Sequence, residues 1–218
     1  MITRREVNSG MLGVAAMTVL PSVAAPQEAQ TLELPKPAMD GGMPLLSALR
    51  LRHSTRAYSD RPISMQSLSN LLWAAFGVNR SSGDRTAPYW RHVMVIDVYV
   101  AMANGVWLYD PKAHVLRPYM PGDIRAQTGL QDFVATAPIN LIYVAHGERM
   151  IDVTPEERRL YASVDAGFIG QNVYLYCASE GLASVFRGGL DAKKLAQTMA
   201  LPDQQFVTFA QTVGYASS

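Results

Sequence analysis

The sequence is poor in cysteine: Cys177 is the only one among 218 residues, which excludes an intrachain disulfide framework and a zinc site built from cysteines. The four histidines are scattered and show no paired-ligand spacing, so we expect no metal site. An excess of one charge is also lacking. With a formal net charge of +1, no global field would recruit nucleic acid or an anionic membrane. Cys177 itself lies in an apolar helical stretch, and we expect a buried, inert thiol.

The N-terminus, residues 1–25, predicts an export signal and not a part of the fold. Arg4 and Arg5 supply a positive start, an apolar run follows over residues 11–20, and residues 23–25 offer small side chains for cleavage. The apolar run is too short to span a bilayer with comfort, so we expect a periplasmic or otherwise exported protein without stable membrane insertion after cleavage. The paired arginines favour the twin-arginine route; an ordinary secretory signal and an uncleaved anchor are the alternatives.

The rest of the chain divides into a linker over residues 26–42, rich in Pro, Ala and Gln, and a globular domain over residues 43–218. Periodic apolar residues predict helices, and β-branched or continuous apolar runs predict strands. The expected helices cover residues 44–52, with a buried leucine face, and residues 65–76, 155–180 and 191–200. The expected strands cover residues 93–100, 105–109, 115–118, 139–145 and 206–215. Helices before, between and after strands imply an α+β layered domain.

The long helical pattern over residues 155–180 ends at Gly181 and contains Gly167 and Gly170 among apolar residues. Small side chains at this spacing let another backbone come close. About 26 residues at a rise of 1.5 Å make a helix longer than a small domain is wide. Because a helix that is apolar on several faces must be buried, a partner subunit would supply the missing cover. A central core helix in a monomer is the alternative.

Two short segments carry the residue types of a binding site. In the run from Arg52 to Arg56, where a helix ends, two guanidiniums, two hydroxyls and an imidazole converge, and guanidinium is the preferred group for bidentate phosphate binding. A solvated basic turn is the alternative. After Gly181 a short apolar strand leads to Gly188 and Gly189, where the lack of side chains lets backbone N–H groups approach a planar ligand. A tight strand-to-helix turn is the alternative there.

Several motifs, taken in order along the chain, resemble those of one family. The run Arg-His-Ser-Thr-Arg-Ala-Tyr-Ser-Asp, residues 52–60, resembles the opening motif of FMN-dependent nitroreductases. The segments that are similar to the thiazoline/oxazoline dehydrogenase (SagB-type) branch are residues 71–77, 85–88 and 105–111. The segments that resemble the family's long helix and flavin-facing turn are residues 165–172 and 180–189. The resemblance runs from residue 45 to residue 215, and it implies an α+β, nitroreductase-like three-layer α-β-α sandwich with a mixed, mainly antiparallel sheet and a long central helix.

The resemblance also implies FMN as the cofactor and a homodimer with FMN at the subunit interface. Arg52 and Ser54 match the positions that hold the FMN phosphate, with His53 alongside, and Arg56 matches the basic residue near the flavin pyrimidine edge. A cation there stabilises negative charge on the reduced ring. The turn whose backbone N–H reaches flavin N5 is matched by Gly188 and Gly189, and the residues that would flank the ring are Phe186 and Arg187.

Two departures from the family pattern change the expected site. The branch often has Ser and, a few positions on, an Asn that contacts the flavin; this chain has the run Tyr89–His92 instead, and His92 is the candidate replacement. The family's basic residues near the C-terminus are missing, so phosphate binding must rest more heavily on Arg52 and Arg56. The candidate residues of the substrate pocket are Tyr89, Trp90, His92 and Tyr119.

We therefore expect an exported FMN-dependent oxidoreductase that carries out two-electron hydride transfer on a small molecule or a peptide-derived substrate. The flavin carries the hard chemistry, so no triad or carboxylate pair is required and no catalytic side chain is singled out. Nicotinamide cofactors are scarce outside the cytoplasm, which makes an NAD(P)H-dependent nitroreductase a weaker alternative. The changed run Tyr89–His92 supports a second alternative, a non-catalytic flavin-binding protein.

Overall fold

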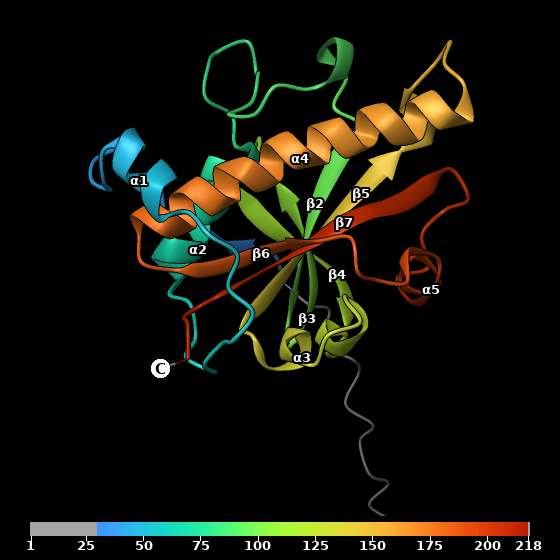
Figure 1. The fold of residues 1–218 in the computed structure, drawn as a ribbon. Coiled ribbons are helices and arrows are strands. Elements are labelled where there is room, and N and C mark those ends of the chain that lie inside the picture. The colour runs from blue at the N-terminus through green and yellow to red at the C-terminus, as the bar shows by residue number, and fades with distance from the viewer. Residues whose placement is uncertain (1–29, 218) are drawn as a thin grey trace, which may run out of the picture.

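A seven-stranded sheet with helices on both faces forms the centre of the domain (Figure 1). The computed structural model describes residues 30–217, so the expected export signal lies outside the described residues. The strands are β1 (Leu32–Glu33), β2 (Ile96–Met102), β3 (Gly105–Asp110), β4 (Val115–Pro121), β5 (Ile139–His146), β6 (Ala183–Arg187) and β7 (Gln205–Gly214). The helices are α1 (Leu45–Leu51), α2 (Met65–Phe76), α3 (Phe133–Thr136), α4 (Pro155–Ser179) and α5 (Ala192–Thr198). Short 3-10 turns cover Trp90–His92, Arg125–Gln127 and Gly147–Arg149.

The strand order is β1-β4-β3-β2-β5-β7-β6, and every pairing among these strands is antiparallel. β5 lies between β2 and β7, and all eight of its residues are buried. Because side chains alternate along a strand, Leu141 and Tyr143 enter the core under α4, whereas Ile142 and Val144 enter the core on the opposite face. The continuous apolar run over residues 139–145 therefore serves two cores, as expected for a strand inside the sheet.

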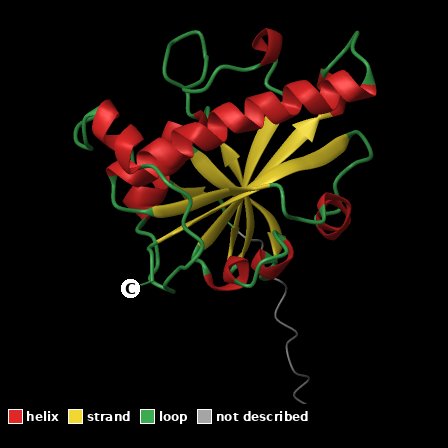
Figure 2. Ribbon diagram, in the orientation of Figure 1, coloured by secondary structure: helices red, strands yellow, loops and turns green. Residues whose placement is uncertain are grey.

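Helices cover both faces of the sheet (Figure 2). α4 runs across one face, and α1 and α2 pack against it. On the other face, α5 packs against the sheet through Leu195 and Met199, and Phe133 of α3 packs against the cluster that contains Val185 of β6. These layers confirm the expected α+β sandwich with a long helix, and the sheet formed by the described residues is wholly antiparallel.

Local capping sets the ends of the helices. Ser64 and Asp191 begin α2 and α5 with side-chain caps, as their positions in the sequence predicted. α4 begins with a capping box in which Thr154 and Glu157 satisfy each other's backbone N–H groups. Gly181 follows the end of α4 with φ +68°, a left-handed conformation that favours glycine. The bounds of the long helix therefore follow from residues near its own ends.

One prediction about α1 is correct and one is wrong. The helix forms over residues 45–51, but its leucine face is not buried in the single chain. Only Ala48 is buried, and the exposed leucines of α1 are Leu45, Leu46, Leu49 and Leu51, with exposed fractions from 45% to 79%. The physical reason is that α4 is the main neighbour of α1 among the described elements, so most of the apolar surface of α1 faces outward. Such a surface needs a cover that residues 30–217 of one chain do not supply.

The ordered domain begins before residue 43. β1 pairs with β4 at the edge of the sheet, and Leu34 joins the core under α2 and α4. Ser69 of α2 donates a hydrogen bond to the carbonyl oxygen of Pro35, and Ala38 donates its backbone N–H to Asn70. The second half of the stretch expected as a linker therefore packs on the domain. Within residues 30–217, no helix is both long and apolar enough to cross a bilayer.

Candidate functional site

The two segments singled out in the sequence lie together because Tyr174 of α4 joins them. Its hydroxyl oxygen lies 2.8 Å from Ser54 Oγ and accepts the backbone N–H of Phe186 at 2.8 Å. A second link runs along the backbone, where the N–H of Thr55 donates to the carbonyl oxygen of Ser184 at 3.0 Å. The run Arg52–Arg56, here called the basic loop, is thus fixed against β6, the strand that leads to Gly188 and Gly189.

The cationic groups of the basic loop face outward. The Arg52 guanidinium lies over the Tyr174 ring, 5.1 Å from its centroid, and His53 Nδ1 lies 2.7 Å from the carbonyl oxygen of Leu51. Arg56 is exposed. Within residues 30–217, neither guanidinium forms an ion pair with a carboxylate. Two cations without internal counter-charges leave this loop able to bind an anion.

A cavity of about 270 Å³ opens beside the basic loop. Its walls come from the loop, the last turn of α4, the start of β6 and the C-terminal segment; they include Arg52, His53, Thr55, Tyr174 and Ala183. Cys177 also lines this cavity, but it is only 1% exposed, which confirms the expected buried thiol. Burial raises the pKa of the Cys177 thiol, so it is protonated at neutral pH.

The end of the chain runs beside the basic loop. Ser59 donates its backbone N–H to the carbonyl oxygen of Tyr215, and Ser217 donates its N–H to the carbonyl oxygen of Ala57. The Arg61 guanidinium stacks over the Tyr215 ring, 3.9 Å from the centroid. Although the C-terminal segment carries no basic side chain, Arg61 places a cation next to it. No local pattern in the sequence distinguishes Arg61, because this proximity depends on the pairing of two distant segments.

Phe186 and Arg187, the two residues expected to flank a flavin ring, point to opposite faces of β6. Phe186 lies on the α4 side, where its ring stacks with Tyr143 at 5.7 Å and packs against Phe209 at 4.7 Å between centroids. The Arg187 side chain is 5% exposed and lies on the other side, hydrogen-bonded to Thr128, Asn140 and Thr212. The strand pleat produces this separation, since neighbouring residues alternate between faces.

Gly188 and Gly189, here called the glycine turn, follow β6 directly. Gly188 is exposed and Gly189 is half-buried. A Cβ on Gly189 would lie 2.7 Å from Nε2 of Gln131, so the end of that exposed side chain would have to move to admit a side chain here. Its carbonyl oxygen accepts the N–H of Leu130, and among the described residues its own N–H has no protein acceptor. The glycine turn therefore presents backbone polar groups at the end of β6.

The run Tyr89–His92, here called the aromatic loop, lies at a different part of α4. The two carboxylate oxygens of Asp165 accept the backbone N–H of Trp90 at 3.0 and 3.2 Å, and the Trp90 ring stacks with Tyr161. Arg91 and His92 have φ values of +45° and +57°, a conformation that is strained for residues with side chains. Asp165 is nine positions before Tyr174, roughly 14 Å along the helix axis. In a single chain the aromatic loop and the basic loop are therefore separate.

The candidate pocket residues of the sequence are not gathered in one place. His92 projects into solvent with its side chain 88% exposed, 3.8 Å from Asp84, and Tyr89 donates a hydrogen bond to the same carboxylate. Tyr119 lies on the opposite face of the sheet, where its hydroxyl donates to the carbonyl oxygen of Met199. Tyr119 thus belongs to a different layer from the aromatic loop.

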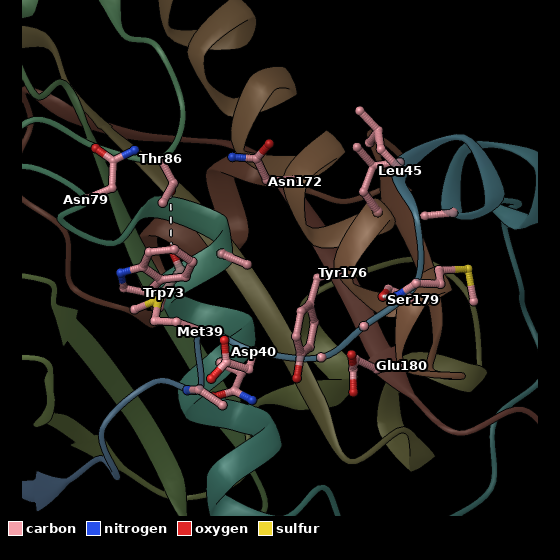
Figure 3. A pocket seen from close by; sticks show the side chains of 18 residues that line it. Met39, Asp40, Leu45, Trp73, Asn79, Thr86, Asn172, Tyr176, Ser179 and Glu180 are labelled. Atoms are coloured by element: carbon pink, nitrogen blue, oxygen red, sulfur yellow. Dashed lines mark hydrogen bonds between the residues drawn. The ribbon is translucent and has the colours of Figure 1, made fainter.

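A larger cavity, about 760 Å³, lies between the segment 38–48, α2 and α4 (Figure 3). Trp73 of α2 and Tyr176 of α4 stand on its walls, with Asn79, Asn172 and Ser179 among the polar groups (Figure 3). No arginine, lysine or histidine lines this cavity within the described residues. It therefore lacks the cations that a phosphate group needs, whereas the smaller cavity beside the basic loop has them.

Sequence reasoning missed Tyr174 and Asp165, the two side chains of α4 that hold these loops. Tyr174 is half-buried, and Asp165 is 3% exposed. Burial raises the pKa of Asp165 to about 6, against the opposing effect of the Trp90 N–H. An acidic residue at a position of the helix whose neighbours are apolar was a usable signal for Asp165, because buried carboxylates are rare without partners. Within residues 30–217, no group of three or more His, Cys, Asp or Glu side chains could hold a metal ion.

Comparison with known proteins places this geometry in a family. A model described as the nitroreductase family matches residues 49–215. The crystal structure of a nitroreductase-type protein from Ralstonia eutropha is 44% identical, with a TM-score of 0.83 over 92% of this chain and 96% of that chain. A Methanocaldococcus jannaschii protein assigned to the nitroreductases is 28% identical over 183 residues, 79% of this chain and 92% of its own length.

A more distant structure shares the fold alone. The NADPH:FMN oxidoreductase of Vibrio harveyi, solved with NAD+, is 20% identical, with a TM-score of 0.59 over 80% of this chain and 69% of that chain. The family match, in contrast, spans the basic loop, the aromatic loop and the glycine turn. On this basis the chain belongs to the nitroreductase family of flavin oxidoreductases.

Proposed function

We propose that the cofactor of this enzyme is FMN and that its phosphate binds at the basic loop. The observation that carries the proposal is the link through Tyr174, which holds Ser54 beside Phe186 of β6, the strand that leads to the glycine turn. A flavin mononucleotide needs a cationic phosphate site at one end and close backbone approach at the other. The basic loop and the glycine turn supply these two features on adjoining segments of the fold.

The residues present fit the phosphate group. Arg52 and His53 line the cavity of about 270 Å³, and the Ser54 hydroxyl lies at its edge with Tyr174. Arg56 and Arg61 add cations on the same loop and beside the C-terminal segment. Arginine forks match phosphate oxygens well, and hydroxyls complete the oxygen shell. The larger cavity, which has no cation among its described lining residues, does not meet this requirement.

In the reaction, the side chains and backbone of this protein bind and orient the cofactor. When bound, FMN supplies two-electron hydride chemistry. Gly189 offers a backbone N–H at the end of β6, and Arg56 offers a guanidinium for the pyrimidine edge. A cation at that edge stabilises the negative charge that hydride uptake leaves behind. No side chain needs to act as a nucleophile.

We also propose that the working form is a homodimer built on the outer faces of α1 and α4. Leu160, Val164 and Phe168 are exposed and form one stripe of α4, because they follow each other at a spacing of four residues. Gly167 lies at the middle of this helix, and a Cβ there would meet nothing within 4 Å. The exposed leucines of α1, which packs against α4, add further apolar surface. A soluble monomer rarely leaves this much apolar surface uncovered.

A two-fold axis near Gly167 brings the separated loops together. When the partner's α4 runs antiparallel to α4 of this chain, the partner's Asp165 lies opposite Ile169. Ile169 is five positions from Tyr174, whereas Asp165 of the same chain is nine positions from it. The aromatic loop of one subunit then approaches the basic loop of the other. This arrangement gives the exposed side chains of the aromatic loop, His92 above all, access to a ligand held by the partner subunit.

For the reaction, we propose the oxidation of a small molecule or a peptide-derived substrate by an exported enzyme. The support is the similarity of residues 71–77, 85–88 and 105–111 to the SagB-type dehydrogenase branch, together with the export signal expected in residues 1–25. Reduction of nitro compounds by NAD(P)H is the second candidate, and the family match supports it. A flavin-binding protein without turnover is the third, and the strained aromatic loop supports it.

The visible spectrum of the purified protein tests the cofactor and separates the candidates. We expect a yellow protein that an organic or peptide donor bleaches and that a quinone or air recolours. Bleaching by NADPH alone supports the nitroreductase reaction. A flavin that no donor reduces supports a flavin-binding protein without turnover. A colourless protein that takes up no added FMN contradicts the proposal.

Arg52→Ala tests the phosphate site. A desolvated phosphate loses a charge-assisted pair, so the FMN dissociation constant should rise roughly 10- to 150-fold. Arg50→Ala is the matched control, since Arg50 is an exposed cation of the same helix turn and does not line the cavity. Equal FMN affinity in both variants would remove the basic loop from the site.

Sedimentation of Phe168→Glu tests the dimer. Lys112→Gln is the charge control, because Lys112 is exposed and its replacement also lowers the net charge by one. Only Phe168→Glu should sediment as a monomer.

A further inference from the structure

Arg187 is a buried cation whose hydrogen-bond acceptors are all neutral. Its Nε donates to Thr212 Oγ1 at 3.1 Å, and its Nη1 donates to the carbonyl oxygen of Thr128 at 2.8 Å. Its Nη2 donates to Asn140 Oδ1 at 3.1 Å and lies 3.4 Å from Thr128 Oγ1. The side chain is only 5% exposed. This geometry satisfies the guanidinium without cancelling its charge.

No carboxylate pairs with Arg187 among residues 30–217. Arg125, in the same layer, shows the contrast: its guanidinium lies 2.7 Å from Asp123. The space for Arg187 comes from Gly129, where a Cβ would clash with the guanidinium. The fold therefore keeps a site for an unpaired cation, although a buried charge without a counter-charge is costly. A neutral side chain of similar shape would fill the same space at lower cost.

The charge persists at neutral pH. Burial lowers the pKa of Arg187 to about 10, so the guanidinium is still protonated. In a protein interior, charges act over longer distances than in water because screening is weak. Arg187 is the last residue of β6 and precedes the glycine turn directly. A full positive charge thus lies at the base of the turn that is proposed to contact the flavin.

We infer that Arg187 does not flank the flavin ring but raises the reduction potential of bound FMN through the field of its buried charge. The inference rests on the proposed FMN site. Hydride transfer carries two electrons and one proton, so it leaves one additional negative charge on the acceptor. A fixed cation stabilises this charge more than it stabilises the neutral acceptor. Arg187 is therefore a tuning residue for the flavin and does not touch the substrate.

The test measures the midpoint potential of bound FMN by equilibration with a reference dye, in four variants of the full protein. Arg187→Gln removes the charge and keeps hydrogen-bonding groups, and Arg187→Lys keeps the charge. Asn140→Asp leaves Arg187 in place and puts an anion beside it. Arg125→Gln is the control, because it removes a cation whose charge Asp123 already balances. FMN affinity and thermal unfolding are measured alongside.

We expect Arg187→Gln and Asn140→Asp to shift the ratio of oxidised to reduced FMN about tenfold toward the oxidised form, or about 30 mV for a two-electron couple. The potentials of Arg187→Lys and Arg125→Gln should stay close to that of wild type.

If Arg187→Gln does not fold, the comparison of the potential of Asn140→Asp with that of wild type decides. Unchanged potentials in the folded charge-altering variants overturn the inference. An equal shift in Arg187→Gln and Arg187→Lys also overturns it, because geometry and not charge would then be responsible. Failure of wild type to bind FMN is a separate result, which contradicts the proposed function itself and the inference with it.

Discussion

The Tyr174 hydroxyl lies 2.8 Å from Ser54 Oγ, across 120 positions of the sequence. The same hydroxyl accepts the backbone N–H of Phe186, so its own proton is available for Ser54. One side chain of the long helix therefore links the basic loop to β6, the strand that leads to the glycine turn.

Replacing Tyr174 with Phe removes the link and leaves the ring in place. The Phe186 N–H then loses its acceptor, and we expect a loss of about 1–2 kcal/mol of unfolding free energy together with weaker FMN binding. Urea unfolding and flavin titration measure the two effects. Tyr176→Phe is the control, since its hydroxyl donates to the carbonyl oxygen of Ser67 in α2, at 3.4 Å, and not to the basic loop or β6. If the two variants behave alike, Tyr174 is not an anchor.

Replacement of Gly170 and of Gly167 with alanine should change the stability of the fold in opposite directions. A Cβ on Gly170 would clash with the Phe186 ring, so Gly170→Ala should destabilise the fold by about 1–3 kcal/mol. A Cβ on Gly167 meets nothing in the chain, and Gly167→Ala should stabilise α4 by up to about 1 kcal/mol. Denaturant unfolding at a protein concentration below any dimerisation separates the two. A large loss in Gly167→Ala at low concentration would contradict the outward position of Gly167.

Asp165 makes the fold more stable in mild acid than at neutral pH. Burial raises its pKa from 3.8 to about 6, so the folded state holds the proton more tightly than the unfolded chain does. Between about pH 4 and pH 6 the unfolded chain binds fewer protons, and stability falls as the pH rises, by roughly 3 kcal/mol in all. Asp165→Asn should lack this fall. Unfolding free energies of both proteins at pH 4.5 and pH 7.5 provide the check, and parallel curves would speak against it.

His146 also makes the fold less stable as the pH rises, but over a higher pH range than Asp165 does. Burial opposes its protonation, but hydrogen bonds to Asp97 and Glu148, each 2.7 Å, outweigh burial and raise the pKa of His146 above 6.5. The stability from the charged ring is fully present below pH 6.5 and is lost as the pH rises through the folded-state pKa. His146→Gln should therefore lose more stability at pH 5.5 than at pH 9. Thermal unfolding at both values tests this, and an equal loss at both would contradict it.

Local features of the sequence were sufficient to predict several helix ends and the buried central strand. The caps Ser64 and Asp191 and the stop at Gly181 predicted three helix ends, because capping involves only neighbouring residues. The continuous apolar run over residues 139–145 predicted a buried strand, since both of its faces need apolar side chains. The ordered set of family motifs was sufficient for the fold and for the flavin oxidoreductase class.

Only the tertiary structure decided which side chains meet. The family resemblance implies a place for Arg187 beside the flavin, but the pleat of β6 turns its side chain to the face opposite Phe186. The leucines of α1 have the period of a buried face, yet the single chain leaves them exposed, because no neighbouring element of the described chain reaches them. Tyr174 joins segments that no local pattern connects. Periodicity and capping are local properties, whereas the face that a strand presents and the partner of a loop depend on the packing of the whole domain.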